Sequence, residues 1–168
     1  MNELNILDLE TDRLKFRQWT EGDYQPVRQF FSEKDHSQYV GGPLNAESSW
    51  RLLSNYIGHY QLKGFSYPAI EEKVSGRLIG SVGLWKSVPW PEHEMGYWLL
   101  PACQGKGYGM EAGKAVLALA RNLKLPTLVS YIDPNNSPSI KLATNLGAKH
   151  DGSIDLLSYG LHEVYRYW

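Results

Sequence analysis

The stretch HEMGYWLLPACQGKGYGMEAGKAVLALARNL, residues 93–123, decides the fold of this chain, and it is predicted to run as strand, glycine-rich turn and helix. Gly105, Gly107 and Gly109 alternate with Lys106 and Tyr108 directly before the helical pattern. Because glycine has no Cβ, the backbone can approach a ligand closely and adopt positive φ. A helix that begins there exposes unpaired N–H groups and the positive end of its dipole, which favours binding of a phosphate or pyrophosphate.

The residues around the turn do not match a Walker A phosphate loop. That motif needs four residues between its first Gly and a Gly-Lys pair, followed by Ser or Thr. Gly113-Lys114 is followed by Ala115, and Tyr108 stands where the first Gly is required. The turn is therefore not predicted to be a nucleotide site of this kind.

The dinucleotide fingerprint G-x-G-x-x-G stays open on the motif alone. Gly107, Gly109 and Ala112 satisfy it, because Ala is accepted at the last position. Asp133 follows a strand-like run roughly 20 residues further on, where such domains carry the carboxylate that binds the ribose.

The order of the predicted elements favours a different fold. Alternating patterns predict strands over 11–19, 65–71, 77–85, from 94, over 127–132, and one or two more from 153 onward. Helices are predicted around Pro26, from Asn45, after the glycines until Pro126, and from Asn136 to Gly147. Their predicted buried faces are Val27, Phe30 and Phe31; Trp50, Leu53, Ile57 and Tyr60; and Tyr108, Ala112, Val116, Leu119 and Leu123. The order β α α β β β α β α β β is mixed α+β, without the steady βαβ alternation of a dinucleotide domain.

A third motif, [Gln/Arg]-x-x-Gly-x-[Gly/Ala], is met by residues 104–109, QGKGYG, and further segments accompany it. They are TDRL at 11–14, EMGYW at 94–98, PNNSPS at 134–139 and LGA at 146–148. In this order they resemble the GNAT superfamily of acyl-CoA-dependent N-acyltransferases, most closely its RimJ/RimL-type branch, over nearly the whole chain. The resemblance implies a central, mostly antiparallel sheet flanked by about four helices. It also implies that the fourth and fifth strands splay apart and hold the pantetheine arm of acetyl-CoA.

The resemblance assigns the cofactor site to the end of the strand and the turn. The backbone of Trp98, Leu99 and Leu100 is expected to pair with the pantetheine amides, almost as another strand. The backbone amides of the turn are expected to hold the pyrophosphate; they belong to Gln104, Gly105, Lys106, Gly107, Tyr108, Gly109 and Met110. Ordinary strand pairing and a tight turn without a ligand are the alternatives.

Acyl transfer from a thioester to an amine requires a deprotonated amine, a polarised carbonyl and a proton for the leaving thiolate. Glu94 is the predicted base, acting directly or through a water, because it shares a strand face with Trp98 just before the proposed site. Apolar neighbours would raise its pKa, and the resemblance supports this role. The alternative is a partly exposed carboxylate paired with a cation.

Asn136 and Ser139 have two interpretations. Their spacing is that of an N-cap and the N3 residue, so capping alone explains both. The resemblance implies that Asn136 also binds the pantetheine arm and that Ser139 lies near the thioester sulfur. Many superfamily members protonate the thiolate with a Tyr at the position of Ala143, so here Ser139 or a water is expected to do so.

The acceptor pocket is predicted to be aromatic. Its candidate lining residues are Tyr67, Trp85, Trp90, His93 and Tyr131. Aromatic side chains on strands also belong to protein cores, which is the structural alternative. The five histidines and Cys103 show no metal-ligand spacing, so no metal is expected.

Composition limits the remaining possibilities. The 168 residues suit one domain, 1–168, and 17 basic against 18 acidic residues leave a net charge of −1, which does not favour nucleic acid. A single cysteine cannot form an internal disulfide and suits a reducing compartment. The first ten residues do not resemble a signal peptide, no run is long enough to span a membrane, and the mean hydropathy is −0.41. A cytoplasmic monomer or homodimer without membrane or nucleic-acid partners is expected.

Together these features predict an N-acetyltransferase that moves an acetyl group from acetyl-CoA to a primary amine by direct attack in a ternary complex. The acceptor would be a protein N-terminus or a small-molecule amine. A non-catalytic acyl-CoA-binding module and, less favoured, a dinucleotide-binding domain are the alternatives.

Overall fold

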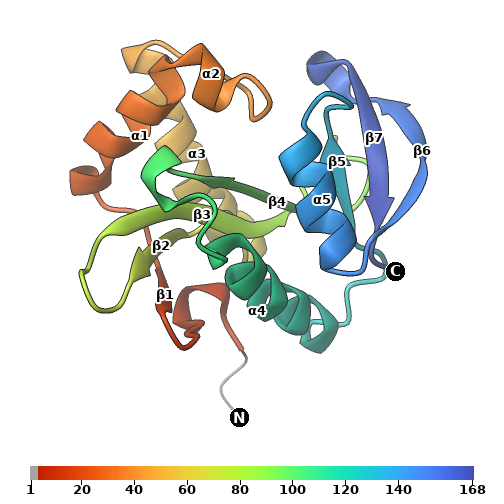
Figure 1. Ribbon diagram of the computed structural model, residues 1–168, viewed down its shortest axis with the longest axis horizontal. Coiled ribbons are helices and arrows are strands. Elements are labelled where there is room, and N and C mark those ends of the chain that lie inside the picture. Colours follow the sequence, from red (N-terminus) through yellow and green to blue (C-terminus); the bar gives the residue numbers. More distant parts are fainter. Residues whose placement is uncertain (1–3) are drawn as a thin grey trace.

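The computed structural model describes residues 4–168, which form one seven-stranded sheet with helices on both faces (Figure 1). The strands are β1 (Leu14–Arg17), β2 (Ala69–Glu72), β3 (Leu78–Trp85), β4 (Glu94–Leu99), β5 (Val129–Ile132), β6 (Lys149–Asp155) and β7 (Leu161–Arg166). The α-helices are α1 (Tyr24–Ser32), α2 (Lys34–Ser37), α3 (Ala46–Lys63), α4 (Tyr108–Asn122) and α5 (Ser137–Asn145). The order in the sheet is β1-β2-β3-β4-β5-β7-β6, and only the β4–β5 pair is parallel. The predicted mixed, mostly antiparallel sheet is confirmed. The short helix α2 was not predicted.

The sheet opens between β4 and β5. Their ladder consists of a single register pair, Glu94 with Val129, held by a hydrogen bond of 3.0 Å from the Val129 N–H to the His93 carbonyl. One residue further along each strand, the Ser130 hydroxyl instead donates to the Met95 carbonyl at 2.5 Å. Beyond this point the strands part, and α5 with β5, β6 and β7 forms one side of the opening (Figure 1). The predicted splay of the fourth and fifth strands is confirmed.

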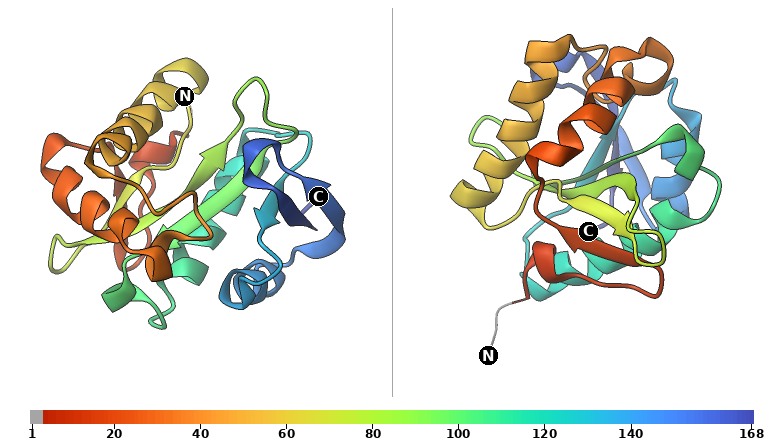
Figure 2. Two further views of the ribbon diagram at one scale, coloured as in Figure 1. Left: turned by 90° about the horizontal axis from the view of Figure 1, so that it is seen from above. Right: turned by 90° about the vertical axis from the view of Figure 1, so that its left-hand side faces the viewer.

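Two apolar layers fix β4 in place. On one face, α4 buries its apolar stripe against residues of β1, β2 and β3 that include Phe16 and Ile79. On the other face, α1 and α3 pack Phe30 and Leu53 against Trp98 of β4. Figure 2 shows these helices on opposite sides of the sheet. The predicted inward face of the first helix, Val27, Phe30 and Phe31, is confirmed.

Two predicted helix faces need correction. Trp50 of α3 is 45% exposed and packs edge-on against Tyr24 at the surface. The buried stripe of α3 is Ser49, Leu53, Tyr56 and His59. Ser49 can be buried because its hydroxyl donates to the Asn45 carbonyl, so the large apolar residue beside it faces outward. Leu123 is 39% exposed because α4 ends at Asn122, one residue earlier.

A cross-strand pair of glycines shapes the sheet surface beside Glu94. Gly83 of β3 lies opposite Gly96 of β4. A Cβ on Gly83 would lie 2.3 Å from the Ser66 carbonyl oxygen, and a Cβ on Gly96 would lie 2.3 Å from the Tyr67 hydroxyl oxygen. The segment with Ser66 and Tyr67 can therefore cross the sheet only because these two positions carry no side chain.

This close approach predicts that Gly83→Ala lowers the free energy of unfolding by about 1–3 kcal/mol, because a backbone carbonyl cannot yield to the new methyl group. Gly58→Ala is the matched control, since a Cβ there meets nothing within 4 Å inside helix α3. The control should stabilise the protein by about 0.5–1 kcal/mol. Urea denaturation of both variants measures the difference. Equal stability of the two variants would contradict the proposed packing.

Candidate active site

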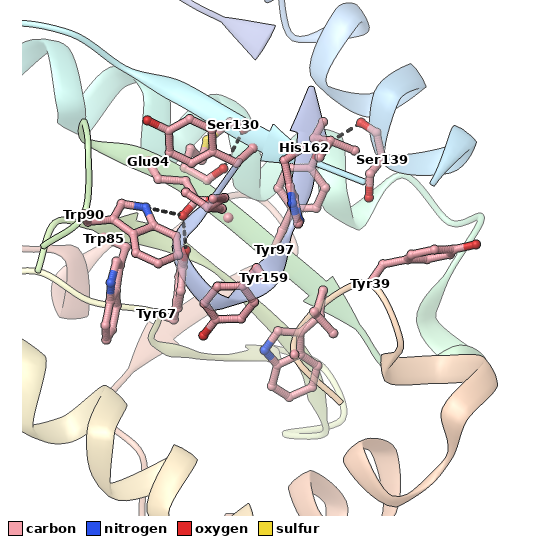
Figure 3. Close-up of a pocket in the computed structure, with 18 of the residues that line it drawn as sticks. Tyr39, Tyr67, Trp85, Trp90, Glu94, Tyr97, Ser130, Ser139, Tyr159 and His162 are labelled. Carbon is pink, nitrogen blue, oxygen red and sulfur yellow. Dashed lines mark hydrogen bonds between the residues drawn. The ribbon is translucent and has the colours of Figure 1, made fainter. Parts of the chain in front are cut away.

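A cavity of about 420 Å³ lies where β4 and β5 part (Figure 3). It is lined by residues from β3, β4, β5 and β7, from α3 and α5, and from the α2–α3, α3–β2, β3–β4 and β6–β7 loops. Glu94, Asn136 and Ser139, which the sequence places far apart, all contribute to its wall. The cavity therefore brings the predicted catalytic residues together.

Glu94 is buried, and only neutral groups bind it. The residue is only 8% exposed. Its Oε2 accepts hydrogen bonds from Trp90 Nε1 at 2.8 Å and from the Tyr67 hydroxyl at 3.4 Å. The Tyr131 backbone N–H also donates to the carboxylate. Within residues 4–168, no salt bridge involves Glu94. The alternative of an exposed, cation-paired carboxylate is therefore wrong.

This environment sets the charge of Glu94. Burial raises its pKa from 4.5 to about 7, and the three neutral donors offset only part of that effect. A carboxyl group with a pKa near neutral can both take up and release a proton at physiological pH, which is the property a general base needs. Glu94 is thus chemically suited to deprotonate a ligand in the cavity.

Asn136 and Ser139 cap α5 and also line the cavity. The Asn136 side chain accepts a hydrogen bond from the Ser139 N–H at 3.4 Å, so the capping interpretation is confirmed. The Ser139 carbonyl accepts a hydrogen bond from the Tyr97 hydroxyl at 2.8 Å, which ties α5 to β4 across the opening (Figure 3). Ala143 is fully buried against Ile132.

The backbone of β4 offers hydrogen-bonding groups to the opening at alternate residues. The carbonyls of His93 and Met95 point toward β5, where they accept from Val129 and Ser130. By the alternation of an antiparallel strand, Tyr97 and Leu99 present their backbone groups on the same side.

This alternation shows that two residues predicted to bind the pantetheine arm, Trp98 and Leu100, turn their backbone groups away from the opening. Leu100 is engaged at both backbone groups, because its N–H donates to Ile79 and its carbonyl accepts from Cys103. Trp98 pairs with Ser81 and lies in the same alternation as Leu100, so its backbone faces β3. Of the predicted backbone set, Leu99 faces the opening, and so does Tyr97, which the sequence analysis did not include.

The glycine-rich turn has the predicted geometry for an anion. Gly105 has φ +73° and Gly107 has φ +81°, in the left-handed region that favours glycine, and Gly107 is the N-cap of α4. The first hydrogen bond of the helix runs from the Glu111 N–H to the Gly107 carbonyl. Within the described chain, the N–H groups of residues 105–110 have no acceptor. They are free to bind a phosphate group.

Some residues of the turn serve the scaffold instead. The Gln104 N–H donates to Pro101 and its side chain donates to the Leu99 carbonyl at 3.0 Å, so Gln104 holds the turn against β4 and has no free amide. The Tyr108 hydroxyl donates to Glu72, away from the turn. A Cβ on Gly109 would lie 3.0 Å from Leu142, so this glycine permits close packing of α4 on α5. Gln104 is thereby removed from the predicted phosphate ligands.

The TDRL segment holds the turn from the other side. Glu111 accepts hydrogen bonds from the Thr11 hydroxyl at 2.6 Å, the Arg13 N–H at 2.9 Å and the Arg13 guanidinium at 2.7 Å. The same guanidinium donates to the Lys106 carbonyl at 3.0 Å. Burial raises the pKa of Glu111, but these donors together hold it below the usual value. The negative charge of Glu111, in the first turn of α4, is therefore balanced by Arg13 beside the anion site.

Four of the five predicted acceptor residues line the cavity, namely Tyr67, Trp85, Trp90 and Tyr131. His93 does not, because strand alternation directs it away from Glu94, and its ring lies 6.1 Å from that of Phe65. Several further lining residues were not predicted from the sequence, and the aromatic ones and the histidine among them are Tyr39, Tyr56, Tyr97, Tyr159 and His162. Of these, the alternation of β4 could have identified Tyr97, whereas the others come from segments distant in sequence.

The described residues contain no cluster of three or more groups able to hold a metal ion, and no helix among them is long and apolar enough to cross a membrane.

Comparison with known proteins decides the family. Residues 13–149 match the family described as acetyltransferase (GNAT) domain. The chain belongs to the GNAT acetyltransferase family. The crystal structure of an acetyltransferase from Agrobacterium tumefaciens superposes with a TM-score of 0.87 at 32% identity, covering 95% of this chain and 93% of that one. An uncharacterized N-acetyltransferase, YnaD of Bacillus subtilis, is 24% identical over 147 residues, covering 87% of this chain and 85% of the relative.

Among more distant structures is RimL, a ribosomal L7/L12 alpha-N-protein acetyltransferase in complex with coenzyme A. It has a TM-score of 0.76 at 17% identity and covers 95% of this chain and 96% of that one. At this identity the likeness concerns the fold. The GNAT family assignment confirms the predicted acyl-CoA-dependent N-acetyltransferase and excludes the dinucleotide-binding alternative.

The raised pKa of the buried Glu94 carboxyl should make the stability of the protein depend on pH. Because the folded-state pKa of Glu94 lies above its unfolded value, the native state binds more protons between pH 4.5 and 7, and stability falls as the pH rises through that window. Glu94→Gln removes this dependence. The stability of the variant relative to the wild type should rise by up to roughly 3 kcal/mol between pH 4 and pH 8.

Urea denaturation across this pH range measures the effect. The control is Glu47→Gln, since Glu47 is exposed and forms a surface pair with Arg51. A relative stability of Glu94→Gln that is as flat with pH as the control would show that Glu94 is not buried as a shifted carboxyl.

Proposed function

We propose that this enzyme transfers an acetyl group from acetyl-CoA directly to a primary amine, with Glu94 as the general base. The observation that carries the proposal is the burial of Glu94 without a cationic partner, in the same cavity as Ser139. A buried carboxyl that has only neutral donors lacks the cation that would balance its charge. The ammonium group of an acceptor would provide that charge when it enters.

The residues present fit acetyl-CoA. The free N–H groups of residues 105–110 suit its pyrophosphate, and the backbone groups of Tyr97 and the N–H of Leu99 suit the amides of its pantetheine arm. The opening between β4 and β5 leads from this turn to the cavity with Glu94. Bound acetyl-CoA would supply an activated acetyl thioester at the cavity.

Each step of the reaction has a candidate group in the chain. The ionised Glu94 takes the proton of the acceptor ammonium, directly or through a water, and so frees the nitrogen lone pair. A backbone N–H of β4 that faces the opening, at Tyr97 or Leu99, polarises the carbonyl oxygen. The Ser139 hydroxyl or a water gives a proton to the thiolate as the C–S bond breaks, and regains one from the nitrogen, which loses its second proton as the amide forms; Ala143 has no group to donate. Asn136, at the same wall, binds the arm in addition to capping α5.

We further assign the chain to the RimJ/RimL-type branch, on the strength of its TDRL, PNNSPS and LGA segments. The acceptor is then a protein N-terminus or a small-molecule amine. A cytoplasmic location is proposed because the only cysteine, Cys103, is a buried free thiol. A monomer and a homodimer are both compatible with this site, which lies within one chain.

A charge test addresses the phosphate site. Gly107→Asp should weaken acetyl-CoA binding at least 100-fold, because the new carboxylate repels the pyrophosphate beside the free N–H groups. Isothermal titration calorimetry measures the dissociation constant. Gly76→Asp is the matched control, because Gly76 also has positive φ, +67°, but lies in the β2–β3 turn. Equal affinity of the two variants for acetyl-CoA would refute the placement of the pyrophosphate.

A pH profile tests the base. For the wild type, kcat/KM should rise with pH up to about 7, as Glu94 loses its proton, and then level off. Glu94→Gln should lower kcat/KM by roughly 10²–10⁴-fold at pH 8 while leaving acetyl-CoA affinity within about threefold of the wild type. Release of free thiol in the presence of amines measures the rate.

Unchanged kcat/KM in Glu94→Gln at every pH would remove Glu94 as base. Tight binding of acetyl-CoA without thiol release from any amine would instead support the non-catalytic acyl-CoA-binding module.

A further inference from the structure

We infer that the acceptor is a small primary amine that carries one positive charge on a flat, apolar body, such as an arylethylamine. This inference rests on the proposed function and concerns the same cavity. It is based on the charges, the ring arrangement and the hydrogen bonds of the cavity wall.

The cavity wall contains one carboxylate and neither Lys nor Arg. Glu94 is that carboxylate, and His162 is the only other ionisable group that is not a tyrosine. One buried carboxylate can balance one ammonium group. A second ammonium, as in a diamine or polyamine, would be desolvated without a partner, and so would the carboxylate of an amino acid. The wall therefore selects a monocation.

Two indoles of the wall, Trp85 and Trp98, stack on other rings of the protein instead of facing an open site for a second cation. Trp85 stacks on His59 at 3.7 Å between ring centroids and on Tyr67 at 5.4 Å. Trp98 stacks on Phe30 at 4.8 Å and on Trp19 at 6.0 Å. Cations bind the faces of aromatic rings, and the faces of these two indoles are engaged by the protein's own rings.

Rings whose faces are engaged offer their edges to the cavity. Ring edges carry a partial positive charge and attract the face of another aromatic ring. Contacts between a ring edge and a ring face already occur within the wall, where Trp90 meets Tyr131 and Tyr159 in T-shaped arrangements at 6.2 and 5.7 Å. A flat aromatic or similarly apolar body on the acceptor complements such a surface, whereas a second ammonium does not.

Three polar groups of the wall are already paired within the protein, which leaves fewer partners for a peptide. The Ser130 hydroxyl donates to Met95, His162 Nδ1 pairs with the Gly160 carbonyl, and the Tyr97 hydroxyl donates to Ser139. A peptide N-terminus would bring several backbone N–H and carbonyl groups into the cavity, and each needs a partner. The cavity of about 420 Å³, at the small end of the range for ligand sites, must also hold the acetyl thioester, so the space left for the acceptor suits a small molecule.

Asp133 is an acid near the cavity that could hold a second ammonium. It lines a second cavity of about 420 Å³, which shares Tyr159 and His162 with the first. One of its carboxylate oxygens already accepts from the N–H and the side chain of Asn135, at 2.8 and 3.1 Å. The test must therefore include diamines long enough to reach Asp133.

The experiment measures kcat/KM by thiol release from acetyl-CoA with a set of matched amines. Phenethylamine is the reference, phenylalanine adds a carboxylate, 1,4-diaminobutane and spermidine add ammonium groups, and a short peptide beginning with Phe represents a protein N-terminus. The inference predicts that phenethylamine exceeds each of the others by at least 100-fold.

A gain-of-function variant sharpens the test. Asn55 lines the cavity from the exposed side of α3, so Asn55→Asp adds a second carboxylate without changing the size of the side chain. The ratio of the kcat/KM for diaminobutane to that for phenethylamine should rise at least tenfold. Asn122→Asp, at the exposed end of α4, adds the same charge away from the cavity and should leave the ratio unchanged.

Faster turnover of a diamine than of phenethylamine, abolished by Asp133→Asn, would overturn the inference in favour of a dication and leave the proposed function intact. Faster turnover of the peptide would overturn it in favour of a protein N-terminus. An absence of thiol release from every amine, with acetyl-CoA bound, would overturn the proposed function and this inference together.

Discussion

The single backbone pairing between Glu94 and Val129 determines where the sheet opens, and the rest of the site depends on it. Because β4 and β5 join at that one register position, their free backbone groups further along face a gap instead of each other. The Ser130 hydroxyl spans to the Met95 carbonyl where the backbones begin to separate. The same pairing holds Glu94 at the base of the opening, so the geometry that exposes hydrogen-bonding groups for a cofactor arm also positions the base.

Burial of Glu94 has an energetic cost that the surrounding structure offsets only in part. Gly83 and Gly96 let Tyr67 lie against the sheet, and Tyr67, Trp90 and the Tyr131 backbone donate to the carboxylate. Since these donors are neutral, they orient the carboxylate without suppressing its pKa to that of a salt-bridged acid. The fold thus retains an uncompensated, destabilising carboxyl group, as is common for groups that handle protons.

Sequence patterns were sufficient for features fixed by local chemistry. The positive-φ glycines and the Asn136 cap require particular residue types, and they were predicted at the right positions. The prediction that the backbones of Trp98 and Leu100 face the opening was wrong. Which side of a strand faces a given neighbour depends on register, and register is a tertiary property. The residues of the wall that come from distant loops, such as Tyr159, left no local signal.

The central claim is that Glu94 is a buried carboxyl with a pKa near neutral, and its titration can be observed directly. The protein would be labelled with ¹³C at the glutamate side-chain carboxyl carbons, and the signal absent from Glu94→Gln would be followed by NMR from pH 4 to pH 9. The structure predicts a midpoint at about 7 for this one signal. A midpoint near 4.5, the ordinary value, would mean that Glu94 is solvated or paired with a cation, and the account of the base would fail.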